Sequence, residues 1–135
     1  MKKSIARFVL LGGIFLLSCP AVLSQREESA PDREVTIIHT VMFSLKSAPD
    51  SQVTAEFLRD GKRILTSIPG VLNFEVRRQV SRKNPYQFGF SMHFADREAF
   101  EEYLNHPLHQ EFVRERWDKE VSGFLEADYT AIPLD

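Results

Sequence analysis

Cysteine is almost absent from this chain of 135 residues, which contains only Cys19. A single cysteine excludes an intramolecular disulfide framework and a zinc ribbon built on cysteine pairs. Clusters of Lys and Arg are also scarce, and the formal net charge is -2. The chain therefore lacks the basic footprint that nucleic-acid binding requires. Glycine-rich phosphate loops, a serine nucleophile elbow and paired catalytic carboxylates are missing as sequence motifs.

The longest apolar run lies near the N-terminus, over residues 8–17, and it is too short to span a bilayer as a helix. It follows a basic stretch and precedes small residues, a pattern typical of a secretory signal. We expect a signal peptide over residues 1–24 and a polar linker over residues 25–33. The protein is then exported to the periplasm or the extracellular space. The alternative is a lipobox ending at Cys19, which would be lipidated and would anchor the protein to a membrane; Pro20 disfavours it.

Hydrophobic periodicity in the rest of the chain predicts the order β-α-β-β-α-α-β. Helices are expected after Ser51, after Asp96 and from Pro107, where capping residues and an N-terminal proline favour helix starts. The first helix is expected to bury Val53 and to end at Pro69–Gly70, and the last is expected to end at Gly123. Strands are expected over residues 35–45, 71–80, 86–94 and 124–132.

This order favours an α+β fold of the ferredoxin-like, split β-α-β type, with the helices on one face of the sheet. A single domain would occupy residues 34–132. The opposite face of the sheet, which includes Ile38 and Met42, would be left uncovered. We therefore expect a homodimer in which two sheets face each other.

Several segments resemble the stress-responsive A/B barrel domain family: residues 37–43, 68–71 and 103–109, and the pair Asp128–Tyr129. The resemblance implies a dimeric α/β barrel. Most members of the family have no assigned activity, but one plant member, olivetolic acid cyclase, carries out an intramolecular aldol cyclisation of a polyketide thioester.

The resemblance to that cyclase also implies site residues. Its cooperating Tyr and His match Tyr103 and His109, its first-strand His matches His39, and an Asp near its site matches Asp128. The cyclase has a further pocket His on the third strand, where this chain has Phe88.

The residues themselves support a shared site for three of these side chains. His39 interrupts an apolar strand face, Tyr103 shares a helix face with Phe100, and His109 lies three residues before Phe112. A desolvated imidazole tends to be neutral and can act as a general base. Tyr103 would then donate a hydrogen bond to a developing enolate or alkoxide.

Structural roles for the same residues remain open. His39 is alternatively a core histidine that fixes the fold, and His106 a cap for the helix that starts at Pro107. A metal site would combine His106 and His109 with His39 or Asp128, although the motif lacks a carboxylate or cysteine ligand. No metal or cofactor is expected.

The second strand is expected to bury the face that carries Leu72, Phe74, Val76 and Val80. Arg78 falls on this face, where a buried guanidinium needs an anionic partner. It is expected to form an ion pair with an acid such as Glu126 or to anchor a ligand. The expected pocket residues are thus Phe88, Phe90, Arg78, Asp128 and His106.

The main functional expectation is a small hydrophobic ligand bound between sheet and helices of an exported homodimer. The alternative is a polyketide cyclase-like enzyme that uses acid–base chemistry of His109 and Tyr103. A haem-degrading or antibiotic-type monooxygenase is a third possibility, because that family shares the barrel, but its motifs are not evident in this sequence.

Overall fold

The computed structural model describes residues 36–134. The expected signal peptide, the linker and Cys19 lie outside these residues. In chain order the elements are β1 (Ile37–Leu45), α1 (Gln52–Leu65), β2 (Leu72–Arg78), β3 (Phe88–Phe94), α2 (Arg97–Asn105), α3 (Pro107–Phe112), the π-helical turn η1 (Val113–Trp117), α4 (Asp118–Glu120) and β4 (Val121–Tyr129). No helix in the described part of the chain has the length and apolar character needed to cross a bilayer.

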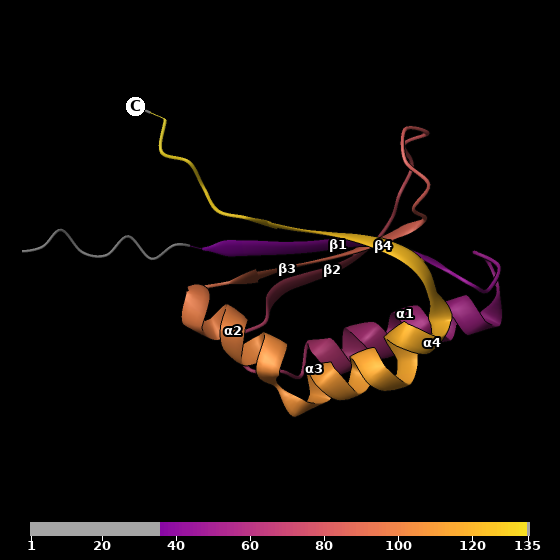
Figure 1. Cartoon of the computed structure of the whole chain (residues 1–135), viewed down its shortest axis with the longest axis horizontal. Helices are drawn as coiled ribbons and strands as arrows, with labels where there is room; N and C mark the ends of the chain where they lie inside the picture. The colour runs from indigo at the N-terminus through magenta and orange to yellow at the C-terminus, as the bar shows by residue number, and fades with distance from the viewer. Residues whose placement is uncertain (1–35, 135) are drawn as a thin grey trace, which may run out of the picture. The chain divides into compact units, whose positions relative to one another are not determined.

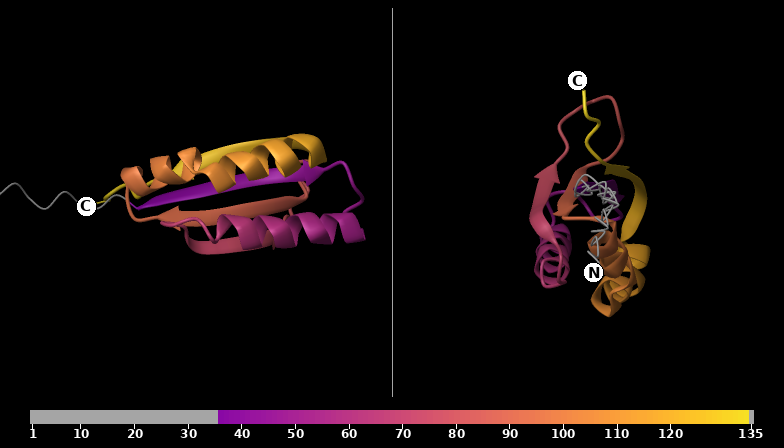
Figure 2. Two further views of the ribbon diagram at one scale, coloured as in Figure 1. Left: turned by 90° about the horizontal axis from the view of Figure 1, so that it is seen from below. Right: turned by 90° about the vertical axis from the view of Figure 1, so that its left-hand side faces the viewer.

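The four strands form one sheet in the order β2-β3-β1-β4, with antiparallel pairing between all neighbours. All the helices lie on the same face of this sheet (Figure 1). The views in Figure 2 show α1 beside the α2–α4 segment beneath the sheet. This is the predicted ferredoxin-like α+β fold, and it leaves the other sheet face without helices.

The core lies between the sheet and the helices. Alternate residues of β1, including Phe43, point into it, because strand neighbours face opposite sides. On β3 the same alternation buries Phe88, Phe90, Met92 and Phe94, and α1 contributes Phe57. Burial of these aromatic and aliphatic surfaces is the main driving force for the fold.

The helices begin where their capping residues predict. The Ser51 hydroxyl accepts a hydrogen bond from the backbone N–H of Thr54 at 3.2 Å, and Asp96 Oδ1 accepts one from the N–H of Ala99 at 2.8 Å. Pro107 is the first residue of α3, and the His106 ring caps it. These contacts satisfy N–H groups that have no partner within the helix.

Two expectations for α1 are wrong. The helix ends at Leu65, ahead of Pro69–Gly70, and Thr66 caps it through backbone bonds to the last turn. Val53 is 52% exposed, and Thr54 is buried in its place. The Thr54 hydroxyl donates a hydrogen bond to the Ala48 carbonyl at 2.8 Å. This bond satisfies the hydroxyl, so a polar residue can occupy an inward position.

The face assignment of β2 is wrong at its start, because the pairing with β3 shifts register between Leu72 and Glu75. Asn73 adopts a positive φ of 50° there. Such an irregularity reverses the direction of the residues before it. Leu72 consequently pairs with His93, and it is 49% exposed rather than buried. Val80 lies beyond the strand and is 89% exposed.

The last helix and strand are also displaced from their predicted bounds. α4 ends at Glu120, and β4 covers Val121–Tyr129 instead of residues 124–132. Gly123 does not stop the helix, because it lies within β4 opposite Ser44. Before α4, the chain makes the π-helical turn η1, which holds one residue more per turn than an α-helix.

Candidate functional site

A cavity of about 200 Å³ lies between the sheet and the helices. Its walls include His39 of β1, Tyr103 of α2 and His109 of α3, so the structure brings the three candidate residues to one cavity. The remaining lining residues are Val41, Leu65, Phe90, Met92, Leu104, Phe112, Val113, Trp117, Asp118, Phe124 and Glu126. Phe124 is 51% exposed, which places the mouth of the cavity beside β4.

His39 is 4% exposed and lies directly opposite Asp128 in the pairing of β1 with β4. Its Nδ1 is 2.6 Å from Asp128 Oδ1. Because an ionised carboxylate only accepts hydrogen bonds, Nδ1 carries the proton in this pair. In the neutral ring, Nε2 is therefore an acceptor, and it has no protein hydrogen-bond partner among residues 36–134. A carboxylate in this position fixes both the orientation and the tautomer of the imidazole.

His109 has the same tautomer for a different reason. Its Nδ1 lies 3.1 Å from the backbone carbonyl of Leu104, which can only accept, so Nδ1 donates and Nε2 is left as an acceptor. Burial lowers the pKa of His109, and the nearby His39 and His106 lower it further, against the opposing effect of the Leu104 carbonyl. The ring is therefore neutral at neutral pH, the state that can accept a proton.

Tyr103 supplies a hydrogen-bond donor to the site. It is 2% exposed, and its ring centroid is 4.5 Å from that of His109 and 6.0 Å from that of His39. Burial raises the pKa of Tyr103 well above its ordinary value, and the negative charge of Glu126 raises it further. The phenol therefore stays protonated, and within the described part of the chain its hydroxyl has no hydrogen-bond partner.

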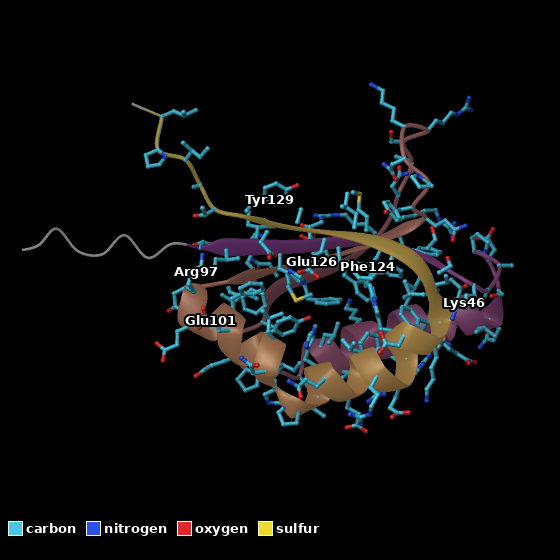
Figure 3. All side chains as sticks on the ribbon, in the orientation of Figure 1. Lys46, Arg97, Glu101, Phe124, Glu126 and Tyr129 are labelled. Atoms are coloured by element: carbon cyan, nitrogen blue, oxygen red, sulfur yellow. The ribbon has the colours of Figure 1, made fainter. Side chains whose placement is uncertain are left out.

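Two carboxylates, Asp118 and Glu126, lie at the mouth of the cavity. Figure 3 shows Phe124 and Glu126 on the helix side of β4, with Tyr129 on the opposite side. His39, Glu126 and Asp128 also offer ligand atoms that lie within 4.8 Å of one another. Among the described residues, this trio is the group that could hold a cation, and it differs from the set containing His106 and His109 considered from the sequence.

The expected pocket residues divide into two groups. Phe90 lines the cavity. Asp128 does not line it, but it accepts a hydrogen bond from His39, which does. Phe88 lies outside the cavity and packs against Phe43, with ring centroids 5.9 Å apart. His106 does not line the cavity either, and its Nδ1 accepts a hydrogen bond from the N–H of Leu108 at 3.3 Å.

The expectation that Arg78 is buried and paired with an acid such as Glu126 is wrong. Its side chain is 54% exposed and forms an ion pair with Asp50 at 2.8 Å. The guanidinium also lies over the ring of Phe88, 5.4 Å from its centroid. Arg78 does share the helix side with Phe88, its partner in the sheet, but it is the last residue of β2 and reaches solvent there.

Sequence reasoning missed Glu126, Phe124 and Trp117 as pocket residues. The signal for the first two was present, because residues 124, 126 and 128 alternate onto one face of a strand. The expected start of this strand at Phe124 gave the correct parity, but Glu126 was considered only as a partner for Arg78. Trp117 lies on the π-helical turn, which no simple periodicity anticipates.

Fold and site together define a ferredoxin-like α+β protein with a cavity of imidazole, phenol and aromatic groups on the helix side of its sheet. Residues 37–131 match the stress responsive A/B barrel domain (Dabb), and the chain belongs to this family.

Solved structures agree with the family assignment. A Dabb family protein with a ferredoxin-like fold from Mesorhizobium loti is 51% identical, with a TM-score of 0.71, over 75% of this chain and 99% of that one. Two more distant structures share the fold. They are a hydroxynitrile lyase from Passiflora edulis (13% identity, TM-score 0.66, 76% of this chain and 98% of that one) and a dimeric ferredoxin-like protein of unknown function from Thermobifida fusca (17%, 0.60, 73% and 93%). No curated protein matches the chain significantly.

Proposed function

We propose that this protein is an exported homodimer that binds a small, largely apolar ligand in the cavity between its sheet and helices. The observation that carries the proposal is the cavity shared by His39, Tyr103 and His109. Its volume of about 200 Å³ exceeds the roughly 150 Å³ in which an apolar protein cavity holds benzene. An aromatic ring with one polar substituent fits this space, and Tyr103 offers that substituent an unused hydrogen-bond donor.

The proposed dimer rests on the sheet face without helices. Leu125 and Tyr129 are 50% and 57% exposed, and they stand opposite Met42 and Ile38 in the pairing of β1 with β4. Contiguous exposed apolar groups of this kind mark interaction surfaces. A Leu125→Glu variant should sediment as a monomer at micromolar concentration, where the wild type should sediment as a dimer. A monomeric wild type would contradict this part of the proposal.

Export is supported by the basic, apolar and small-residue succession over residues 1–24. Mass spectrometry of the protein secreted by a host that expresses the full chain should give a mature N-terminus at Gln25. A lipid-modified N-terminus at Cys19 would instead show an anchored protein, and a protein found only inside the cell with an intact N-terminus would contradict export.

Ligand binding can be measured without labels, because Trp117 is the only tryptophan of the chain and lines the cavity. Titration with 2-phenylethanol, which has one ring and one hydroxyl, should change its emission with a saturable curve. Tyr103→Phe should weaken this binding, since the hydroxyl loses its donor. Tyr129→Phe removes the same atom on the other sheet face and should bind as the wild type does. A linear, non-saturating response of the wild type would contradict the proposal.

A second candidate function is acid–base catalysis at a carbon next to an electron-withdrawing group, as in the polyketide cyclase expectation. The two imidazoles favour it, because their Nδ1 atoms are occupied by Asp128 and Leu104, so each can accept a proton at Nε2. Tyr103 is then placed to donate a hydrogen bond to the oxygen that gains negative charge.

This candidate can be tested with 5-nitrobenzisoxazole. A base removes its carbon-bound proton, the N–O bond breaks, and a coloured cyanophenolate forms. General-base catalysis is worth about 10²–10⁴ in rate, so His109→Gln should lower the rate by at least a factor of about 10². His93→Gln, in a strand position that faces away from the helices, is the matched control. A rate that His109→Gln and His39→Gln leave unchanged would exclude this function.

A further inference from the structure

The polar groups around the cavity are mostly hydrogen-bond acceptors. His109 donates through Nδ1 to the Leu104 carbonyl, which leaves Nε2 of its neutral ring as an acceptor. His39 donates through Nδ1 to Asp128, and the neutral form of its ring presents Nε2 as an acceptor too. Glu126 and Asp118 add carboxylate oxygens. The donors among the lining side chains are the Tyr103 hydroxyl, which also accepts, and the Trp117 indole N–H. A ligand that complements this set is therefore rich in donors.

The carboxylates give the surroundings of the cavity a negative charge. Of the described residues that line the cavity, none is Lys or Arg, whereas Asp118 and Glu126 are both acidic. A third carboxylate, Asp128, stands behind His39 and lies close to Glu126. A bound anion would meet like charges at the mouth, and a cation would meet opposite charges at short range.

The mouth also presents aromatic surfaces. Trp117 and Phe124 meet edge to face, with ring centroids 5.6 Å apart, and both line the cavity with Glu126. Aromatic faces attract ammonium groups through their quadrupole, and Trp is the strongest of these partners.

A buried group independently indicates that a polar ligand atom belongs in this cavity. Tyr103 is 2% exposed, and among residues 36–134 its hydroxyl makes no hydrogen bond. The one fully enclosed side-chain atom without a partner in these residues is Gln87 Oε1, so the Tyr103 hydroxyl faces the open space of the cavity. A hydroxyl aimed into such a space is available to a polar ligand atom, as it is to water. Since this phenol lines the cavity, a ligand can supply the missing bond.

We propose that the ligand is an aromatic or similarly apolar molecule that carries a protonated amino group. Its apolar body lies against Phe90 and Phe112, and its ammonium group lies at the mouth beside Glu126, Trp117 and Phe124. This inference rests on the proposed ligand-binding function and adds the chemical class of the ligand.

A matched series of three probes tests the charge preference: 2-phenylethylamine, 2-phenylethanol and 3-phenylpropionate, titrated against Trp117 emission at about pH 8. The amine should bind about tenfold more tightly than the alcohol, and the carboxylate should bind more weakly than the alcohol. Glu126→Gln should remove about tenfold of the amine affinity and leave the alcohol within about twofold, because one charge-assisted contact is worth roughly this factor.

Glu101→Gln provides the control, because it makes the same change in total charge on α2, away from the cavity (Figure 3). It should leave all three affinities unchanged. If the alcohol binds as tightly as the amine, or if Glu101→Gln lowers amine affinity as much as Glu126→Gln does, the ammonium site is wrong while ligand binding stands. If none of the three probes binds, both the inference and the proposed function fail.

Discussion

Two regions of the helix–sheet interface are equally buried but differ in how their groups are satisfied. In the packed half, Phe43 and Phe57 are both 0% exposed and lie with ring centroids 5.8 Å apart. In the hollow half, His39 and Tyr103 are 4% and 2% exposed, yet Tyr103 has an unused hydroxyl and the space beside it is empty of protein atoms. Burial alone therefore does not distinguish the two halves, whereas the adjoining cavity does.

The largest effect should come from the packed half. Phe57→Ala removes a fully buried ring that contacts Phe43, Phe90 and Phe112. Large-to-small changes of this type cost about 3–5 kcal/mol in free energy of unfolding. Urea denaturation followed by far-UV circular dichroism measures it. A loss below about 1 kcal/mol would show that the two halves do not differ as described.

Gly61→Ala should disturb the packing at the boundary between the packed half and the hollow half. A Cβ at Gly61 would lie 2.7 Å from Phe90 Cζ, so α1 or the Phe90 ring must move. Overpacking of this kind costs about 1–3 kcal/mol, partly offset by the better helix propensity of Ala. Because Phe90 lines the cavity, affinity for 2-phenylethanol should fall too.

Gly123→Ala is the matched control for that substitution, because a Cβ there meets nothing within 4 Å. It should change neither stability nor affinity by a measurable amount. Equal effects of the two substitutions would mean that the short distance between Gly61 and the Phe90 ring affects neither stability nor affinity.

Tyr103→Phe should have a small effect on stability, within about 1 kcal/mol, despite the complete burial of this side chain. The variant keeps the ring and removes a hydroxyl that makes no hydrogen bond within residues 36–134, so the folded state loses no contact. Thermal unfolding without ligand measures the difference. A loss of 2 kcal/mol or more would reveal a structural role for the hydroxyl and remove the main distinction between the two halves.

The smallest effect concerns pH. The pKa of His109 is lowered by burial, so the unfolded chain binds a proton at higher pH than the folded chain does. Stability is therefore complete above the ordinary histidine pKa of about 6.5 and falls as the pH drops below it. His109→Gln should lose less stability than the wild type between about pH 7.5 and 5, measured from urea midpoints. His93→Gln serves as the control, and identical pH profiles of wild type and His109→Gln would contradict a buried, neutral imidazole.

The sequence predicts the elements and their order well where amphipathic periodicity is strong. β1 and β3 alternate strictly, with Phe43 and Phe90 inward, and the capping residues Ser51 and Asp96 mark the helix starts. From this pattern alone the ferredoxin-like arrangement follows, together with the helix side on which His39 and Tyr103 lie.

The errors occur where a local irregularity changes the periodicity. The register shift at Asn73 turns Leu72 outward, and strict alternation does not anticipate it. Arg78 lies on the predicted face but reaches solvent, because alternation gives the direction of a side chain and not where its covering helix ends. Gly123 was interpreted as a helix stop, although a glycine is also accommodated within a strand.

The candidate site is partly predictable for the same reason. His39, Tyr103 and His109 each interrupt or share an apolar face, which indicates inward positions. The volume of the cavity and its acidic mouth depend on how three strands and five helical segments pack together, and no spacing along the chain encodes that.

The π-helical turn between Val113 and Trp117 gives this chain a simple route to a differently shaped cavity. Loss of a single codon within it would restore regular α-helical winding and rotate the indole by about one residue step, roughly 100°, relative to the helices before it. The wall of the cavity that Trp117 forms would then change, while the strands and the His39–Asp128 pair kept their positions. Gene lineages that gain or lose this residue are expected to diverge in what they bind before they diverge in architecture.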